Sequence, residues 1–482
     1  MKVIKNYLYN VVYQVLLLIV PLITVPYISR VLGPDLVGIN SYTNSWMTFF
    51  MLVGQMGISL YGNREIAYHR ENKEQRSKIF WGIEALQLLT ILFALALYIT
   101  AVMLFSTTFK RYFLLQTFWI IAAGVDVSWY FMGMENFQRT VTRNLVVKII
   151  SVIMILALIK NHNDLGKYIV ILGGSNLVGN LTLWPYLKKE IVWVPLREWK
   201  PFSHFYPSLL LFIPTITTQI YLVVNRLMLG RMSTQNQLGQ FENTDKIIKI
   251  ILAVVTASGQ VMLPHIANKF SNGNVKGVRD SLYNSFDFIT ALAVPMMFGV
   301  MAVAEPLAPW FLGQAFAPAG ELMMVEAPII LFIAWSNVTG IQYLMPVNRT
   351  NEYTISVSIG AVVNIVANVF LIALFAAKGA ALATDVSEFA VTAVQLYYIR
   401  NTISRRKLFS SVWKYLLCGL VMFLIVFRLS HMIKMSVPNL VVEVITGALA
   451  YVVGIILIHA PIVDQALHLI SNRKKDQNRG NK

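Results

Sequence analysis

Long apolar runs alternate with short polar connections along nearly the whole chain. About fourteen runs reach the roughly 18–25 residues that an α-helix needs to cross a bilayer. None shows the period-two alternation of a membrane strand, and unpaired backbone cannot face lipid, so the pattern predicts helices. The predicted spans are 9–30, 38–61, 80–104, 113–134, 144–160, 168–187, 205–229, 239–263, 282–304, 321–345, 354–375, 379–399, 412–430 and 438–460.

One short pattern occurs twice, in the first and the seventh span. Residues 16–24 and 209–217 are identical at six of nine positions, and each copy carries a proline in mid-helix. Arg30 and Arg226 follow the two copies, three and four residues before a glycine. The repeat predicts two units of six helices, which are parallel because six is an even number. The expected parts are a six-helix lobe over 1–200, a second over 201–402, and two further helices with a basic tail over 403–482.

The composition requires a nonaqueous solvent. Apolar residues make up 56% of the chain and charged residues only 13%, whereas a soluble domain carries about 25% charged residues. The longest predicted connections are 62–79, 188–204, 264–281 and, on the outer side, 305–320. None of them is long enough for a soluble catalytic domain.

Basic residues are distributed unevenly between the two sides of the predicted bundle. With the N-terminus inside, 28 of the 40 Lys and Arg fall in inner connections or at the termini, so both termini are predicted to be cytoplasmic. The net charge of +17 is mostly this bias, and no nucleic-acid partner is expected. The first run is too long for a signal peptide and lacks a cleavage site, so we expect it to remain as a span.

Motifs of several enzyme classes are absent from the sequence. It has no phosphate-binding G-x-x-x-x-G-K-[ST], no zinc-binding H-E-x-x-H and no G-x-S-x-G nucleophile motif. The single cysteine, Cys418, excludes an internal disulfide and leaves no cysteine metal set. We therefore expect neither enzymatic activity nor a cofactor or metal.

Polar residues in three spans form helical stripes. They are Asn40, Asn44, Thr48 and Gln55 in the second span, Thr215, Thr218 and Asn225 in the seventh, and Asn364 and Asn368 in the eleventh. Residues three or four apart share one face of a helix. We interpret the stripe of the second span as the wall of a wet cavity. Hydrogen bonding between helices is the alternative for all three stripes.

Charged residues in the spans are more specific, because each costs on the order of 3 kcal/mol at mid-bilayer unless it is paired or hydrated. Four cations lie in the outer half of the predicted bilayer: Arg30, Arg226, Lys246 and Lys249. The alternative is that their side chains extend to the outer interface. The acidic residues of the spans are Glu84, Asp126, Asp287, Glu326, Asp385 and Glu388. Among these, Glu84 and Asp126 are the candidates for ion coupling or for a structural ion pair.

Several stretches, in order from residue 1 to about 400, resemble one family. They are 1–10 (MKVIKNYLYN), 26–34 (PYISRVLGP), 61–65 (YGNRE), 126–135 (DVSWYFMGME), 242–249 (ENTDKIIK), 340–346 (GIQYLMP) and 379–384 (GAALAT). As a set they are similar to the polysaccharide repeat-unit flippases of the multidrug/oligosaccharidyl-lipid/polysaccharide exporter superfamily. The last two spans match that family only by hydropathy.

The resemblance implies two parallel six-helix lobes around a cationic central cavity, and transport by alternating access. The implied substrate is undecaprenyl diphosphate carrying an oligosaccharide, moved from the inner to the outer leaflet for capsule, exopolysaccharide or teichoic acid. The implied setting is a bacterial cell membrane, with membrane lipids and a polysaccharide polymerase as candidate partners. The family often has an acidic residue where this chain has Asn225, which weakens the case for a coupling carboxylate there.

The sequence leaves two other functions open. A cation-coupled multidrug exporter of the same fold would favour an acidic, aromatic site, whereas the first and seventh spans carry more basic than acidic residues. A membrane transferase or polymerase is the other.

A diphosphate carries about two negative charges, so a flippase needs basic side chains that reach both phosphates. We expect Arg226 and Lys246 to make these contacts, together with Lys249, and Arg30 to be the counterpart in the first lobe. The remaining candidates for the substrate path are Asn40, Asn44, Thr218 and Asn225.

Overall fold

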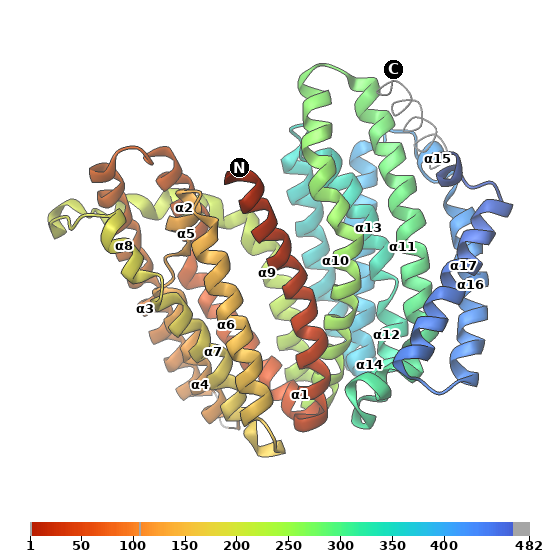
Figure 1. Ribbon diagram of the computed structural model, residues 1–482, viewed down its shortest axis with the longest axis horizontal. Coiled ribbons are helices and arrows are strands. Elements are labelled where there is room, and N and C mark those ends of the chain that lie inside the picture. Colours follow the sequence, from red (N-terminus) through yellow and green to blue (C-terminus); the bar gives the residue numbers. More distant parts are fainter. Residues whose placement is uncertain (1, 106–107, 466–482) are drawn as a thin grey trace. The chain divides into compact units, whose positions relative to one another are not determined.

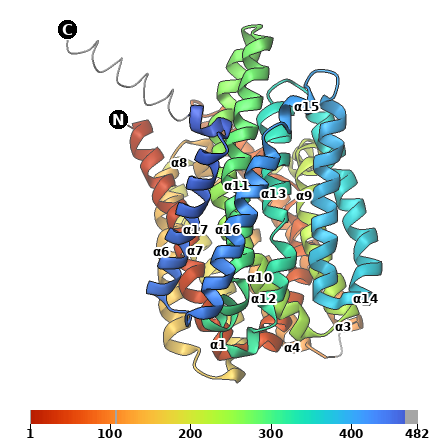
Figure 2. The same ribbon diagram turned by 90° about the vertical axis from the view of Figure 1, so that its right-hand side faces the viewer.

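The computed structural model describes the backbone of residues 2–105 and 108–465. The side chains of residues 2–18, 213–215, 217–218, 220–221 and 258–261 are outside the description. Within the described ranges all regular elements are helical (Figures 1 and 2), which confirms the predicted all-α class. Ten helices of the described part are long and apolar enough to cross a membrane. The chain is therefore a multi-pass membrane protein.

Two compact units make up the chain, residues Met1–Gly239 and Gln240–Lys482. The first contains α1 (Lys2–Gln55), α2 (Ile58–Tyr68), α3 (Lys73–Phe105), α4 (Lys110–Gly124), α5 (Ser128–Gly133), α6 (Phe137–Leu158), α7 (Leu165–Leu181), α8 (Trp184–Glu190) and α9 (Phe205–Met232), with the short 3-10 turns η1 (His162–Asp164), η2 (Leu196–Glu198) and η3 (Pro201–His204). Because α9 packs against α1 and α2, this unit extends beyond residue 200. The predicted lobe boundary follows the sequence repeat instead and stays a prediction.

The second unit contains the rest of the chain. α10 (Gln235–Ser271) begins in the first unit and continues in the second. It is followed by α11 (Val275–Leu312), η4 (Gln314–Phe316), α12 (Ala319–Glu326), α13 (Ile329–Ser336), the π-helical segment η5 (Asn337–Leu344), α14 (Thr350–Ile399), α15 (Arg405–Leu408), α16 (Val412–Met432) and α17 (Val437–Leu457).

Two of the long helices are each two spans joined at a sharp kink. Gly33 breaks α1 with φ 73° and ψ 172°, a conformation that glycine adopts because it has no Cβ. Ala376 breaks α14 with φ 52° and ψ −122°. Counting both halves of these two helices, and adding α7 and α9, gives the predicted count of about fourteen spans.

Three of the predicted connections between spans are wrong, because most of their residues are helical. The segment 264–281 is helical except for a short turn, since α10 runs to Ser271 and α11 starts at Val275. Asn274 caps α11 by accepting a 2.8 Å hydrogen bond from the backbone N–H of Gly277. Likewise α11 extends to Leu312, and 62–79 holds most of α2 and the start of α3. Hydropathy locates only the most apolar part of a helix, and each of these helices continues beyond it.

The fourth predicted span of each half is irregular in its C-terminal part. In the first unit, α4 stops at Gly124 and α5 starts at Ser128. The side chain of Gln87 replaces missing backbone partners, with Nε2 donating to the carbonyls of Ala123 (2.9 Å) and Asp126 (3.0 Å). The corresponding span 321–345 is split into α12, α13 and η5. Breaks of this kind are tolerated in a membrane where side chains satisfy the freed backbone groups.

Two of the family-like motifs pack against each other. Trp129, from 126–135, is 1% exposed and stacks on Phe80 with ring centroids 5.4 Å apart. Its indole N–H donates to Oε1 of Gln87 (3.1 Å). The ring covers Gly62, where a Cβ would lie 2.5 Å from a Trp129 carbon. These motifs therefore join α2, α3 and α5, which is a structural role.

The last two spans are attached to α11 (Figure 2). In α16, Tyr415 donates to Oδ2 of Asp287 (2.9 Å) and Ser430 donates to the carbonyl of Ala302 (3.0 Å). Small residues allow close packing, since Gly419 lies against Phe298 and Gly454 of α17 lies against Cys418. Asp287 thus accepts hydrogen bonds from the hydroxyl of Tyr415 and from the amide of Gln465 (3.2 Å).

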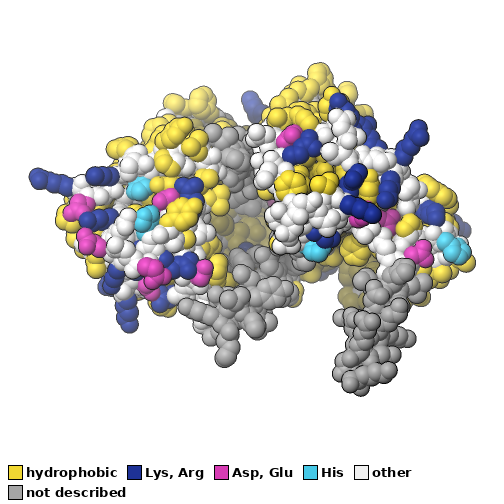
Figure 3. Space-filling model, turned by 90° about the horizontal axis from the view of Figure 1, so that it is seen from above, with side chains coloured by type: hydrophobic (Ala, Val, Ile, Leu, Met, Phe, Trp, Pro, Cys, Tyr) yellow, Lys and Arg dark blue, Asp and Glu magenta, His cyan; other side chains and the backbone are white. Residues whose placement is uncertain are grey.

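The end of each unit that Figure 3 shows carries Lys and Arg side chains. In the first unit this end carries the turn between α2 and α3, and in the second it carries α15. Basic residues of this kind are expected on a cytoplasmic face. The orientation itself stays a prediction.

A cysteine-labelling experiment tests the orientation. In a Cys418→Ser background, single cysteines at the exposed positions Glu71, Gln314 and Arg405 report the side of each loop. We expect an impermeant thiol reagent added outside intact cells to label position 314 and to leave 71 and 405 unlabelled until the cells are opened. The opposite pattern would reverse the orientation.

Candidate functional site

The second half of α1 is in very close contact with the start of α10. A Cβ added at Gly38 would lie 1.7 Å from the carbonyl oxygen of Gln235, and one at Gly239 would lie 1.9 Å from that of Pro34. Only glycine permits this approach of two backbones. Beside it, the Asn236 amide donates to Oδ2 of Asp35 (3.1 Å). We call residues 34–38 and 235–239 the glycine contact.

Nearby, the end of α9 packs on α1. At Gly230 an added Cβ would lie 2.4 Å from Cδ2 of Tyr42 and 3.0 Å from a methyl carbon of Leu238. The glycine that follows Arg226 in the sequence repeat is therefore needed for packing. In the first copy of the repeat, the glycine that follows Arg30 instead provides the kink of α1.

The polar stripe of the second span meets α4 at a single glutamine. Gln116 is 1% exposed, and its Nε2 donates to Thr43 (3.1 Å) and to Asn40 (3.3 Å). Asn44 donates to Oε1 of Gln116 at 3.5 Å. Asn40 and Asn44 are only partly buried, so they keep some exposed surface. They thus make interhelical hydrogen bonds, and their place on a substrate path stays a prediction.

The other two stripes are less exposed. Asn364 and Asn368 are fully buried, and Asn368 donates to Asn364 at 2.9 Å. Asn225 is 5% exposed, and the side chain of Thr218 lies outside the described residues. The described part of these stripes forms packed helix interior.

The four predicted cations differ in their surroundings. Arg30 is exposed, one turn before the kink at Gly33, and Arg226 is partly buried in α9. In α10, Lys246 pairs with Glu242 (3.1 Å) and Lys249 pairs with Asp245 (2.7 Å), each across one helical turn. An acidic residue four positions before a lysine is a favourable helical pair. The sequence analysis missed these partners, although the i, i+4 spacing was visible in the 242–249 motif.

Comparison with known proteins defines the family. Residues 3–270 match the family described as polysaccharide biosynthesis protein. This chain belongs to that family.

Individual relatives agree with the assignment. The "Putative O-antigen transporter" of Escherichia coli (strain K12) is 22% identical over 401 residues, covering 82% of this chain and 96% of that protein. A solved structure of lipid II flippase MurJ in an inward closed conformation has a TM-score of 0.76 at 14% identity, covering 95% of this chain and all of that one. A multidrug resistance MATE transporter of the MOP superfamily, inward-facing, has a TM-score of 0.62 at 12% identity, covering 83% and 94%. At these identities the two structures show a common fold, and the expected resemblance is confirmed.

Glu84 and Asp126 are the two residues that the sequence suggested for ion coupling or for a structural ion pair, and their surroundings differ from those of a simple ion pair. Glu84 is 1% exposed, and its carboxyl oxygens accept no hydrogen bond from the residues that the structure describes. Asp126 accepts the backbone N–H of Ser128 (3.0 Å) at the start of α5. No salt bridge to a Lys or Arg joins either carboxylate in the described part of the chain. Ion coupling through them stays a prediction.

Replacing Asn44 distinguishes the two interpretations of the polar stripe. If the stripe contacts substrate, Asn44→Leu lowers export while membrane abundance stays normal. Met47→Leu is the control, because Met47 is 1% exposed, packs with Ile91 and Tyr98, and changes little in volume. Export of the glycan per amount of protein is the measurement. Equal tolerance of both changes would assign the stripe to helix packing.

Proposed function

We propose that this member of the polysaccharide biosynthesis family is a flippase for an oligosaccharide linked to undecaprenyl diphosphate. It moves the molecule from the inner to the outer leaflet of a bacterial cell membrane, for capsule, exopolysaccharide or teichoic acid. The observation that carries the proposal is the family match over residues 3–270 in a chain whose helices carry cations within the membrane. The similarity to a protein named as an O-antigen transporter supports transport rather than catalysis.

The cations suit a diphosphate. Arg226 presents a planar fork that binds phosphate oxygens bidentately, and a lysine acts as a point charge. Lys246 and Lys249 already have carboxylate partners on their own helix. This pairing lowers the cost of placing two cations in the bilayer when no substrate is present. We infer that phosphate oxygens replace these carboxylates when substrate binds.

The glycine contact supports transport by alternating access. By the predicted orientation it lies on the outer side, where it holds α1 against the start of α10. Release of a glycan on that side requires these helices to separate. A contact between bare backbones contains few side-chain interactions, so it is suited to repeated opening and closing.

A deletion of the gene tests the function itself. We expect accumulation of a lipid-linked oligosaccharide on the inner side of the membrane, detected by mass spectrometry of extracted lipids, and loss of the surface polymer. Unchanged lipid-linked intermediates together with increased sensitivity to cationic drugs would instead favour the multidrug exporter.

Substitutions of the cations test the substrate contacts. Arg226→Ala and Lys246→Ala should each lower export by about 10- to 100-fold, because a hydrogen bond to a charged group contributes about 1.5–3 kcal/mol. Arg226→Lys should retain partial export, since the charge remains and the fork does not. Lys110→Ala, at an exposed position at the start of α4, is the control. Normal export by a protein that lacks both Arg226 and Lys246 would refute this assignment.

A bulkier residue at the glycine contact tests alternating access. Gly38→Ala places a carbon where the carbonyl of Gln235 lies, so the contact should open. In a Cys418→Ser background, a cysteine at the buried position Leu238 should then react severalfold faster with an impermeant thiol reagent. Gly174→Ala is the control, since an added Cβ there meets nothing within 4 Å. Identical reaction rates in the two variants would show that the contact does not separate.

A further inference from the structure

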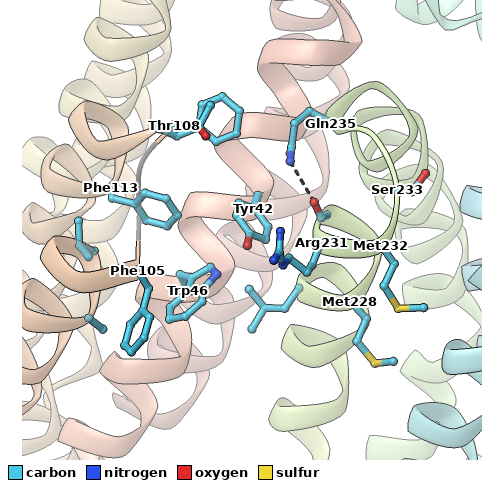
Figure 4. Close-up of a pocket in the computed structure, with 15 residues that line it drawn as sticks. Tyr42, Trp46, Phe105, Thr108, Phe113, Met228, Arg231, Met232, Ser233 and Gln235 are labelled. Carbon is cyan, nitrogen blue, oxygen red and sulfur yellow. Dashed lines mark hydrogen bonds between the residues drawn. The ribbon is translucent and has the colours of Figure 1, made fainter.

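A pocket of about 920 Å³ lies in the first unit, at the end where α3 and α9 finish (Figure 4). Its walls come from α1, α3, α4, α9 and the start of α10. None of the residues proposed above to contact the diphosphate lines it. Its volume lies in the range of about 300–1,000 Å³ that is typical of small-ligand sites.

One wall of this pocket is aromatic. Phe113 is 4% exposed and meets Tyr42 and Trp46 edge to face, with centroid distances of 6.0 and 6.3 Å. Trp46 also stacks on Phe50 at 6.1 Å. These contacts fix the rings of Tyr42 and Trp46, which remain partly exposed. Fixed, partly exposed aromatic rings offer flat apolar surfaces to the C–H face of a sugar ring.

The opposite wall carries a single charge. Arg231 extends from the last turn of α9 toward Tyr42 (Figure 4). It is exposed and forms no hydrogen bond or ion pair with any residue that the structure describes. Among the described residues that line the pocket, none is acidic, whereas Thr108, Ser233 and Gln235 supply polar groups. The pocket therefore has a positive charge and several polar groups.

We propose that this pocket binds a carboxylate-bearing sugar of the transported oligosaccharide. The guanidinium of Arg231 holds the carboxylate through a bidentate pair of hydrogen bonds, and the sugar ring lies on Tyr42 and Trp46. By the predicted orientation the pocket is on the outer side, where it receives the glycan after translocation. The proposal rests on the proposed function. A hydrophobic cation is disfavoured, because Arg231 repels it.

The test measures binding without transport. The purified full-length protein, in nanodiscs of zwitterionic lipid, is titrated into fluorescently labelled tetrasaccharides and followed by anisotropy. One probe alternates glucuronic acid with N-acetylglucosamine, and the other is an uncharged tetrasaccharide of N-acetylglucosamine. We expect the acidic probe to bind at least tenfold more tightly.

Four variants resolve the contributions of the two walls. Arg231→Gln should remove the preference for the acidic probe, and Arg231→Lys should keep part of it. Trp46→Leu should weaken both probes. Arg111→Gln is the control, because Arg111 is an exposed arginine on α4 that does not line the pocket. Monodisperse elution of each variant shows that it is folded.

Three results would overturn the proposal. They are equal affinity of the wild type for both probes, an unchanged preference in Arg231→Gln, and full competition by millimolar inorganic phosphate or by nanodiscs of anionic lipid, which would identify a phosphate site. Arg226→Ala separates this proposal from the proposed function, since it should lower export and leave binding of the acidic probe intact. The purified protein could bind the acidic probe tightly while deletion of its gene leaves the lipid-linked intermediates unchanged. That combination would mean that the transport function alone has failed.

Discussion

Hydrocarbon offers no hydrogen bonds, so every backbone polar group of this chain has to be satisfied from within the protein. Continuous helices meet this requirement, and the exceptions show how strict it is. Where α4 breaks before α5, Gln87 supplies amide donors to two freed carbonyls. Asn180 and Trp184 donate to the carbonyls of Ala122 (2.7 Å) and Val125 (2.9 Å). Four neighbouring carbonyls thus have side-chain donors from three other elements, and the break fixes how those elements pack.

The same constraint governs the charged residues. Lys246 and Lys249 each lie within reach of a carboxylate one turn away, so α10 carries these two cations as neutral pairs. Such pairs are compatible with the bilayer and can still exchange partners, because a phosphate offers the lysine the same kind of oxygen. Arg30 is different, since its exposed position next to the kink at Gly33 allows its side chain to extend toward a polar environment.

The sequence predicted well those features that depend on local properties. Span positions follow from hydropathy, and the kinks at Gly33 and Ala376 fall between predicted spans. Helix ends were predicted poorly, because α10 and α11 continue beyond the apolar runs. Gln116 was missed as the shared partner of Asn40 and Asn44, since it comes from another helix 72–76 residues away. Close backbone approaches such as that of Gly38 to Gln235 depend entirely on tertiary packing.

Tyr42 links the pocket to the packing of α1 on the end of α9. Its ring packs on Gly230 and also forms part of the aromatic wall, while Arg231 is the next residue of α9. Separation of α1 from α9 would therefore move the aromatic rings away from the guanidinium and divide the pocket. A ligand held by both walls binds the closed arrangement, in which α1 and α9 are in contact, more tightly than the arrangement in which they are apart. The difference between its two binding free energies is the amount by which the ligand stabilises the closed arrangement. Binding of a glycan there would accordingly oppose opening, and its departure would accompany separation of the helices.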